Sequence, residues 1–331
     1  MKNDSLFRSL SFAVFVLLFL GVSLSGQESH RVASARPASV PQNYAITPFG
    51  YFHPSCVRSL ADDDTLFSDG RVQRANGAID PKVAVCSYPH YPPTGVPVIG
   101  DAKELTGANL AQAGESTITG WLEYISATTK TSYRELSATW TVPQRPTNNE
   151  GQVLFFFPGF QDYNNSLSIV QPVLQWGRAA SGGGPYWAIA SWNCCIFGTT
   201  FFSRLRRVST GDAILGTIAP MCKSPKKIQS CTIWKIVTAD VTSGKNSTLR
   251  QNPADGQVWN WGFGAVAEVY GVRQCDDFPA DAGVTFSTEL YDNNGVRISD
   301  PGWTVSPADG GVTPQCNYGL SFTNTEQTLQ Y

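Results

Sequence analysis

Short runs in which apolar and polar residues alternate recur along the chain from about residue 115, and Gly, Asn, Asp and Pro separate them. Alternation with a period of two residues places successive side chains on opposite faces of the backbone, which is typical of β-strands. No stretch shows convincing helical periodicity. The expected strands span residues 118–126, 136–142, 152–157, 167–176, 186–192, 201–208, 213–218, 232–238, 246–251, 258–270, 284–291 and 319–323.

Turn-forming residues lie between several of these runs. The sequences STGD at 209–212, TSGK at 242–245 and DNNG at 292–295 are typical of hairpin turns. Together with the short strands they predict an all-β fold for residues 115–331, an antiparallel β-sandwich of two large sheets.

Residues 27–114 have a different composition, rich in Pro, Ser and Ala, with stretches such as SYPHYPPTGVPVIGD at 87–101. Proline lacks the backbone donor that a sheet interior requires, so we expect an irregular N-terminal segment. Two interpretations stay open. The segment is either a pro-segment with local order around Cys56 and Cys86 or a loosely packed extension of the main domain.

Residues 1–26 resemble a secretory signal peptide. Lys2 and Arg8 precede an apolar run at 13–22, and small residues follow it. A membrane anchor is the alternative, but the run is short for a bilayer span. We therefore expect a secreted, extracellular protein with no stable membrane anchor after cleavage of the signal.

Eight cysteines, an even number, suggest disulfides in an exported protein. The adjacent Cys194 and Cys195 could bond to each other, pair elsewhere or stay free. The other plausible pairs are Cys56–Cys86, Cys222–Cys231 and Cys275–Cys316.

The overall charge excludes one class of partner. The hydrophobic fraction of 42% and the charged fraction of 15% indicate an ordered globular protein. A net charge of -2 implies no basic surface for a phosphate backbone, so no nucleic-acid partner is expected.

The distribution of histidine limits the chemistry. No histidine follows His90, so the predicted sandwich has no Ser-His-Asp triad, no Cys-His pair and no histidine metal ligand. The glycines at 182–184 are interpreted as a flexible loop between two strands and not as a phosphate-binding loop. We expect no metal and no cofactor, so any catalysis would use carboxylates, amides or hydroxyls.

Two glutamines share one face of the run SIVQPVLQWG at 168–177. Alternation places Gln171, Val173 and Gln175 on one face and Trp176 on the other. Polar side chains on a strand rich in Val, Leu and Ile require either solvent or a function.

One carboxylate interrupts an apolar strand. Glu268 lies in GAVAEVYGV at 264–272, on the same face as Val266 and Tyr270. Burial would raise the pKa of this carboxyl, which suits a general acid or base. If the face is open to water, Glu268 is simply hydrated.

These motifs, in their order along the chain, resemble the glutamic endopeptidases, the pepstatin-insensitive acid proteases also called eqolisins. The resemblance covers most of residues 115–325 and implies a concanavalin-A-like jelly roll. The segments that carry it are ATWTVPQRP at 138–146, FFFPGFQD at 155–162, SIVQPVLQWG at 168–177, the Trp-rich strand at 187–192, VSTGDAILGTI at 208–218, AEVYGV at 267–272 and VTFST at 284–288.

The resemblance implies a catalytic pair of one Glu and one Gln that hydrolyses a polypeptide by direct attack of water. The Glu corresponds to Glu268. Counting residues from Gly159 favours Gln171 as its partner, which we prefer, whereas the local Leu-Gln-x-Gly pattern favours Gln175. In this mechanism the carboxylate takes a proton from water, and the amide stabilises the developing oxyanion.

The resemblance also implies a substrate cleft around this pair. Positions that align with acidic residues of the family are neutral here, at Gln161 and Ser191. The residues expected to line the cleft are Phe157, Gln161, Trp176, Trp187, Trp192 and Tyr270.

Two other functions remain open from the sequence. One is a non-catalytic sandwich that binds glycans or cell-wall polymer through aromatic platforms, for which core packing of the tryptophans is the alternative explanation. The other is a glycoside hydrolase, which needs two carboxylates about 5–10 Å apart, and Glu268 has no obvious partner. The tryptophans considered for a platform are Trp176, Trp187, Trp192, Trp259 and Trp261.

Overall fold

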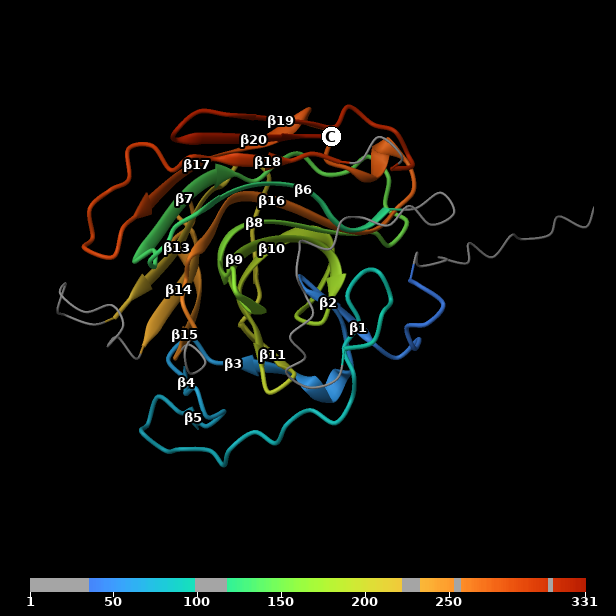
Figure 1. Cartoon of the computed structure of the whole chain (residues 1–331). Coiled ribbons are helices and arrows are strands. Elements are labelled where there is room, and N and C mark those ends of the chain that lie inside the picture. Colours follow the sequence, from blue (N-terminus) through green and yellow to red (C-terminus); the bar gives the residue numbers. More distant parts are fainter. Residues whose placement is uncertain (1–35, 99–117, 222–232, 253–256, 309–311) are drawn as a thin grey trace, which may run out of the picture. The chain divides into compact units, whose positions relative to one another are not determined.

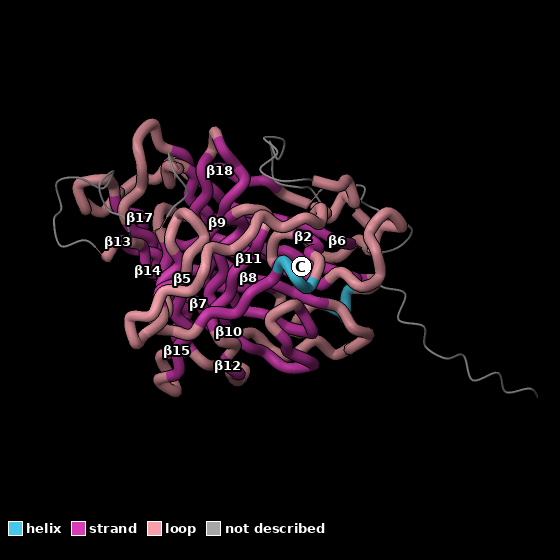
Figure 2. The backbone as a smooth tube through the Cα atoms, turned by 90° about the horizontal axis from the view of Figure 1, so that it is seen from below, coloured by secondary structure: helices cyan, strands magenta, loops and turns pink. Residues whose placement is uncertain are grey.

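The chain folds almost entirely into β-strands. The computed structural model describes residues 36–98, 118–221, 233–252, 257–308 and 312–331. Within these ranges the helical elements are short 3-10 turns at Pro54–Cys56 and Cys275–Asp277, and Figure 2 shows how little of the backbone they occupy. No helix in these ranges is long and apolar enough to cross a membrane. The predicted signal peptide lies outside the described residues.

The first of two large sheets holds the candidate site residues. Its strands are antiparallel except where β3 runs parallel to β11, and β12 (Arg206–Arg207) pairs with β10 beside the main path. The order across this sheet is β18 (Thr304–Ser306), β6 (Ile118–Thr128), β16 (Trp261–Val272), β8 (Val153–Asp162), β9 (Asn165–Ala179), β10 (Gly182–Ile196), β11 (Thr199–Ser203) and β3 (Val57–Leu60).

The second sheet packs against one face of the first. Its strands are antiparallel except where β4 runs parallel to β15. The order is β19 (Gly319–Phe322), β20 (Glu326–Gln330), β17 (Gly283–Tyr291), β7 (Glu135–Thr141), β13 (Ala213–Pro220), β14 (Trp234–Asp240), β15 (Lys245–Gln251), β4 (Thr65–Leu66) and β5 (Val72–Gln73).

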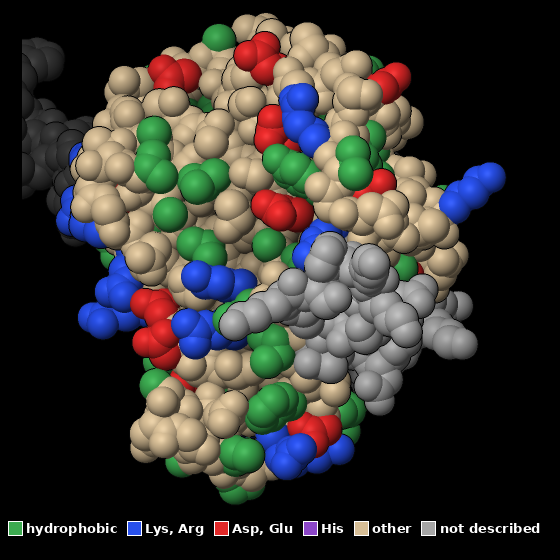
Figure 3. All heavy atoms as spheres, turned by 90° about the vertical axis from the view of Figure 1, so that its left-hand side faces the viewer, with side chains coloured by type: hydrophobic (Ala, Val, Ile, Leu, Met, Phe, Trp, Pro, Cys, Tyr) green, Lys and Arg blue, Asp and Glu red, His purple; other side chains and the backbone are tan. Residues whose placement is uncertain are grey.

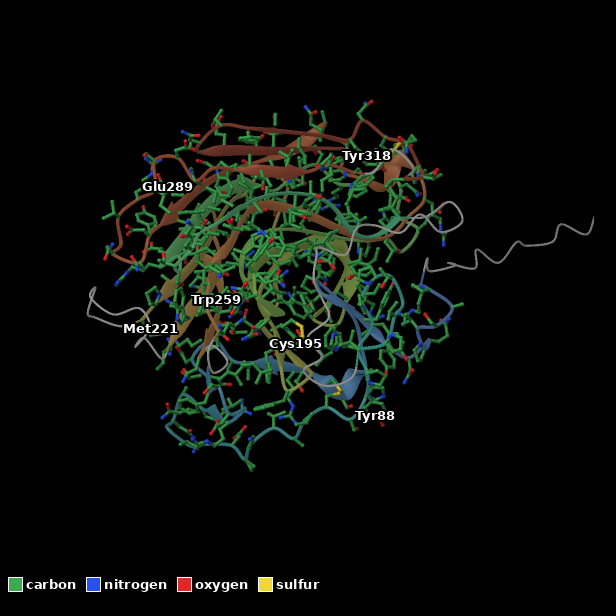
Figure 4. All side chains as sticks on the ribbon, viewed as in Figure 1. Tyr88, Cys195, Met221, Trp259, Glu289 and Tyr318 are labelled. Carbon is green, nitrogen blue, oxygen red and sulfur yellow. A yellow bond between two sulfur atoms is a disulfide. The ribbon has the colours of Figure 1, made fainter. Side chains whose placement is uncertain are left out.

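Side chains that point between the two sheets form one large apolar core. Alternate positions of each strand contribute to it, with Leu174 and Trp176 from β9 and Trp234 and Ile236 from β14. Trp259 belongs to the same core (Figure 4). The outer face of the second sheet is more exposed, because buried positions alternate with partly or fully exposed ones along β14 and β17. Figure 3 looks onto the side that carries β13 and β14 and shows charged side chains scattered among a larger uncharged area.

The other face of the first sheet is apolar too, and the N-terminal segment (residues 36–98) packs against it. We call this second face of the first sheet the covered face. Phe155 and Val266 of the sheet share an apolar cluster with Tyr51 and Phe52 of the segment. Figure 1 shows the short strands β1 (Ala45–Thr47) and β2 (Gly50–Phe52) on this side of the curved sheet.

The N-terminal segment is packed more closely than the loose extension considered from the sequence. Its strand β3 extends the first sheet, and its strand β4 extends the second. Phe52 and Leu66 are fully buried. Burial of each such side chain contributes about 2 kcal/mol to the free energy that holds the segment against the sheets.

Three disulfides join described cysteines. Cys56–Cys86 and Cys275–Cys316 form as predicted. The adjacent Cys194 and Cys195 bond to each other, which was one of the open alternatives (Figure 4 marks Cys195). Cys222 and Cys231 lie outside the described residues.

The prediction of an all-β sandwich is confirmed. Some elements were not predicted, namely β18, β20 and the short strands of the N-terminal segment, because each is short and lacks clear alternation. The prediction of a loop at Gly182–Gly184 was wrong, since these glycines begin β10.

Glu123 of β6 is a buried glutamate. It lies near Ala308, Tyr318 and Gly319, on the side of the first sheet that faces the second sheet. Its side chain is 1% exposed. Burial raises its pKa from the ordinary value of 4.5 to about 8, and the nearby backbone amides of Ala308 and Gly319 oppose the rise. Glu123 is therefore a neutral acid in the folded protein at pH 7.

This protonation predicts a pH-dependent stability. Between about pH 4.5 and 8 the unfolded chain releases the Glu123 proton and the folded chain keeps it. The free energy of unfolding then falls as pH rises, by roughly 1 kcal/mol per pH unit for one such group. We expect the free energy of unfolding of Glu123→Gln, measured by denaturant titration at a series of pH values, to fall less steeply with pH than that of the wild-type protein. The exposed Glu326→Gln serves as the control, and an unchanged slope in Glu123→Gln would contradict the assignment.

Candidate functional site

Glu268 and Gln175 lie level with each other on the covered face. In the strand register Glu268 pairs with Phe155, and Phe155 pairs with Gln175. Residues that pair across antiparallel strands point to the same side of the sheet, so these three side chains form one row. With strands about 4.8 Å apart, the Cα atoms of Glu268 and Gln175 lie about 10 Å apart.

Gln171 shares this face but not this row. It pairs with Trp192 on β10 and lies beside Gly159 on β8. Because it precedes Gln175 by four residues, it lies about 13 Å further along the strand. In the strand register Gln175, and not the glutamine preferred from the sequence, Gln171, is therefore level with Glu268.

The Glu268 carboxyl is buried and hydrogen-bonded to a neighbouring side chain. It is fully buried, and the Tyr270 hydroxyl donates a hydrogen bond of 2.5 Å to its Oε1 atom. Burial raises its pKa to about 8, and the hydrogen bond from Tyr270 and the nearby Trp121 side chain oppose that rise. At neutral pH the group is a protonated acid that cannot accept a proton from water.

The β9–β10 hairpin fixes the Gln175 amide. Its Nε2 atom donates to the carbonyls of Gly177 at 3.0 Å and Gly182 at 2.9 Å, while the Ser181 hydroxyl donates to its Oε1 atom at 2.7 Å. A side chain at Gly183 would obstruct this arrangement, because a Cβ there would lie 2.6 Å from Nε2. The glycines at the start of β10 thus make room for the amide.

The N-terminal segment occupies the space in front of these groups. The Gln171 Nε2 atom donates to the Pro48 carbonyl at 3.0 Å. The backbone of Gly50 hydrogen-bonds Tyr270, and the Tyr51 ring packs edge-on against the Tyr270 ring at 5.3 Å between centroids. A substrate cannot reach Glu268 while the turn between β1 and β2 stays in this position.

The remaining predicted cleft residues divide between the two faces. Phe157, Trp192 and Tyr270 belong to the covered-face cluster. Gln161, which is 5% exposed, lies on the same face by strand alternation.

Trp176 and Trp187 lie on the opposite face, in the core between the sheets, and contact each other at 5.3 Å between ring centroids. They cannot line a cleft that contains Glu268, so their assignment to the cleft is corrected. Ser191 also points toward the second sheet, where its hydroxyl contacts Thr238 at 3.0 Å.

Sequence reasoning did not identify three residues that shape the site. Phe155 lies between Glu268 and Gln175, Trp121 contacts the carboxyl, and Tyr51 covers Tyr270. The sequence does show a run of three phenylalanines at 155–157 and a tryptophan on the strand that pairs with Glu268. That these residues lie beside Glu268 follows only from the strand register.

The alternatives from the sequence gain no support here. The tryptophans considered as sugar platforms are each 8% exposed or less. Glu123 and Glu268 lie on adjacent strands but on opposite faces of the sheet, so they do not form the carboxylate pair of a glycosidase. Within the described ranges, no group of three or more His, Cys, Asp or Glu side chains is arranged to hold a metal ion.

Comparisons with known proteins show a distant structural similarity. No protein-family profile matches the sequence, and no curated protein matches it. Scytalido-glutamic peptidase with a peptide-based transition state analogue is similar over 65% of this chain and 99% of that chain, at 13% identity and a TM-score of 0.47. SCP-B, a member of the eqolisin family of peptidases in complex with the tripeptide Ala-Ile-His, covers the same shares at 13% identity and a TM-score of 0.45.

A tailspike protein from Escherichia coli O157:H7 bacteriophage CAB120 is similar over 57% of this chain and 25% of that chain, at 14% identity and a TM-score of 0.24. At these identities and TM-scores the likenesses carry no argument about activity.

Proposed function

We propose that this protein is a latent acid hydrolase of peptide bonds, exported after loss of residues 1–26, in which Glu268 and Gln175 activate a water molecule once the N-terminal segment leaves the covered face. The observation that carries the proposal is the row formed by Glu268, Phe155 and Gln175 on one face of the first sheet. Residues 27–114 then act as a pro-segment, and residues 115–331 form the catalytic domain.

The row suits addition of water to a peptide carbonyl. With the segment displaced, the Phe155 ring forms a floor between the two polar side chains, and a peptide on this floor contacts both. The Glu268 carboxylate takes one proton from water as the hydroxide oxygen bonds to the carbonyl carbon. The Gln175 amide exchanges a hairpin hydrogen bond for one to the oxyanion, and Glu268 then passes the proton to the leaving amine.

Burial explains why the covered form would be inactive. A general base must be ionised, and burial holds the pKa of Glu268 at about 8 while Tyr51 and Tyr270 close off water. Displacement of the segment hydrates the carboxyl and lowers its pKa toward the ordinary value of 4.5. The carboxyl is then ionised, and can act as a base, above about pH 4.5.

Ion pairs attach the segment to the catalytic domain. Asp62 pairs with Arg206 at 2.8 Å and accepts a hydrogen bond from the Thr248 backbone at 3.1 Å. Asp63 pairs with Arg250 at 2.8 Å. Loss of these two ion pairs would weaken the attachment of the segment.

Substitution of either member of the proposed catalytic pair should slow proteolysis. After incubation of the full chain at about pH 3 to displace the segment, digestion of haemoglobin at about pH 5, where a hydrated glutamate is ionised, should proceed in the presence of pepstatin. Glu268→Gln should lower the rate by about 100-fold or more because it removes the base. Gln175→Ala should lower it by a similar factor, since it removes the oxyanion donor.

Gln171→Ala is the matched control, an amide on the same strand face that lies outside the row. It should retain most of the activity. Loss of activity in Gln171→Ala but not in Gln175→Ala would reverse the assignment of the glutamine, and absence of proteolysis by the wild-type protein throughout the acid range would refute the function.

A further prediction concerns latency. Asp62→Asn combined with Asp63→Asn removes both ion pairs, so the segment should be displaced more readily and proteolysis should be faster than in the wild-type protein after the same incubation. Activity measured after incubation at a series of pH values provides the comparison. Asp69→Asn, which removes an ion pair with Arg71 inside the segment, is the control. Equal activation profiles for all three proteins would show that these ion pairs do not hold the segment in place.

A further inference from the structure

A basic hollow lies beside the hairpin that holds Gln175, outside the candidate catalytic row. Its volume is about 480 Å³. The turn between β11 and β12 and the start of β15 enclose it, and Leu205 on its wall contacts the position of Gly182 in that hairpin. The lining residues are Arg204, Leu205, Arg206, Arg207, Gly244, Lys245 and Asn246.

Positive charge dominates this hollow although the chain as a whole carries a net charge of -2. None of the described residues that line it carries a carboxylate. Arg206 pairs with Asp62, but no described carboxylate forms an ion pair with Arg204, Arg207 or Lys245. Four neighbouring cations repel one another, so an anion in the hollow would relieve that repulsion.

The fold positions three of these four cations before any ligand arrives. Arg206 donates from Nε to the Asn246 carbonyl at 3.1 Å and is held at its other end by Asp62. The Arg207 guanidinium lies over the Tyr186 ring at 4.6 Å, and Lys245 donates to the Arg207 carbonyl at 3.0 Å. Side chains that are fixed in this way lose little conformational entropy when they bind a ligand.

We propose that this hollow binds oxyanion groups of the sulfate or phosphate type. A guanidinium donates to two oxygens of such a group at once, and a tetrahedral group presents further oxygens to cations on other sides. Arg204, Arg207 and Lys245 approach from the two separate segments that enclose the hollow. The anion is either a free ion or a substituent on an exported polysaccharide, and both present the same chemistry.

The test uses the intact chain and requires no hydrolytic activity. Calorimetry measures binding of dextran sulfate, unsubstituted dextran and inorganic sulfate at low and moderate salt. Dextran sulfate or inorganic sulfate should bind, with affinity that falls as salt rises, and unsubstituted dextran should not. Much tighter binding of dextran sulfate than of inorganic sulfate would identify a polymer-borne group, and similar affinity per sulfate group would identify a free ion.

Arg204→Gln combined with Lys245→Gln should weaken the binding at least tenfold. Lys130→Gln, an exposed cation in the turn between β6 and β7, is the matched control and should leave it unchanged. All three side chains are exposed, so thermal unfolding curves that match the wild-type protein establish that the fold is intact. No binding of either sulfate form, or binding that the double variant leaves unaltered, would overturn the proposal.

Discussion

A sheet that is apolar on both faces must be covered on both faces, and this requirement shapes the molecule. Every position of β8 is buried, although the second sheet packs against only one of its two faces. The N-terminal segment supplies the second cover, with Tyr51 and Phe52 placed on the far side of the first sheet. Because hydrophobic burial scales with the area removed from water, a chain without this cover would expose a large apolar surface.

The same cover determines the state of the candidate site. Glu268 would be an ordinary carboxylate on an open sheet, but under the N-terminal segment it is fully buried, and its pKa rises to about 8. The proposed latency therefore needs no separate inhibitor, because the residues that complete the apolar packing also keep the base protonated. Asp62 and Asp63 contribute to this attachment through their pairs with Arg206 and Arg250.

Alternation along single strands could be predicted from the sequence, whereas pairing between distant strands could not. Alternation with a period of two residues correctly predicted that Gln171 and Gln175 lie on one face of their strand and Trp176 on the other. Which glutamine is level with Glu268 depends on how β9 and β16 each pair with β8, and the strands β10 to β15 separate β9 from β16 along the chain. The cover was equally hard to predict, because a Pro-rich segment contributes Tyr51 and its neighbours without any periodic pattern.

The central claim is that the N-terminal segment keeps Glu268 as a neutral, buried acid, and infrared spectroscopy tests it directly. The difference spectrum between the intact protein and Glu268→Gln isolates this one carboxyl. At pH 6 to 7 the account predicts the carbonyl stretch of a protonated acid, because the pKa is about 8. That band should disappear once acid has released the segment and the protein has been returned to pH 6, because the hydrated carboxyl then ionises. A carboxylate signal in the intact protein at pH 6 would contradict the account.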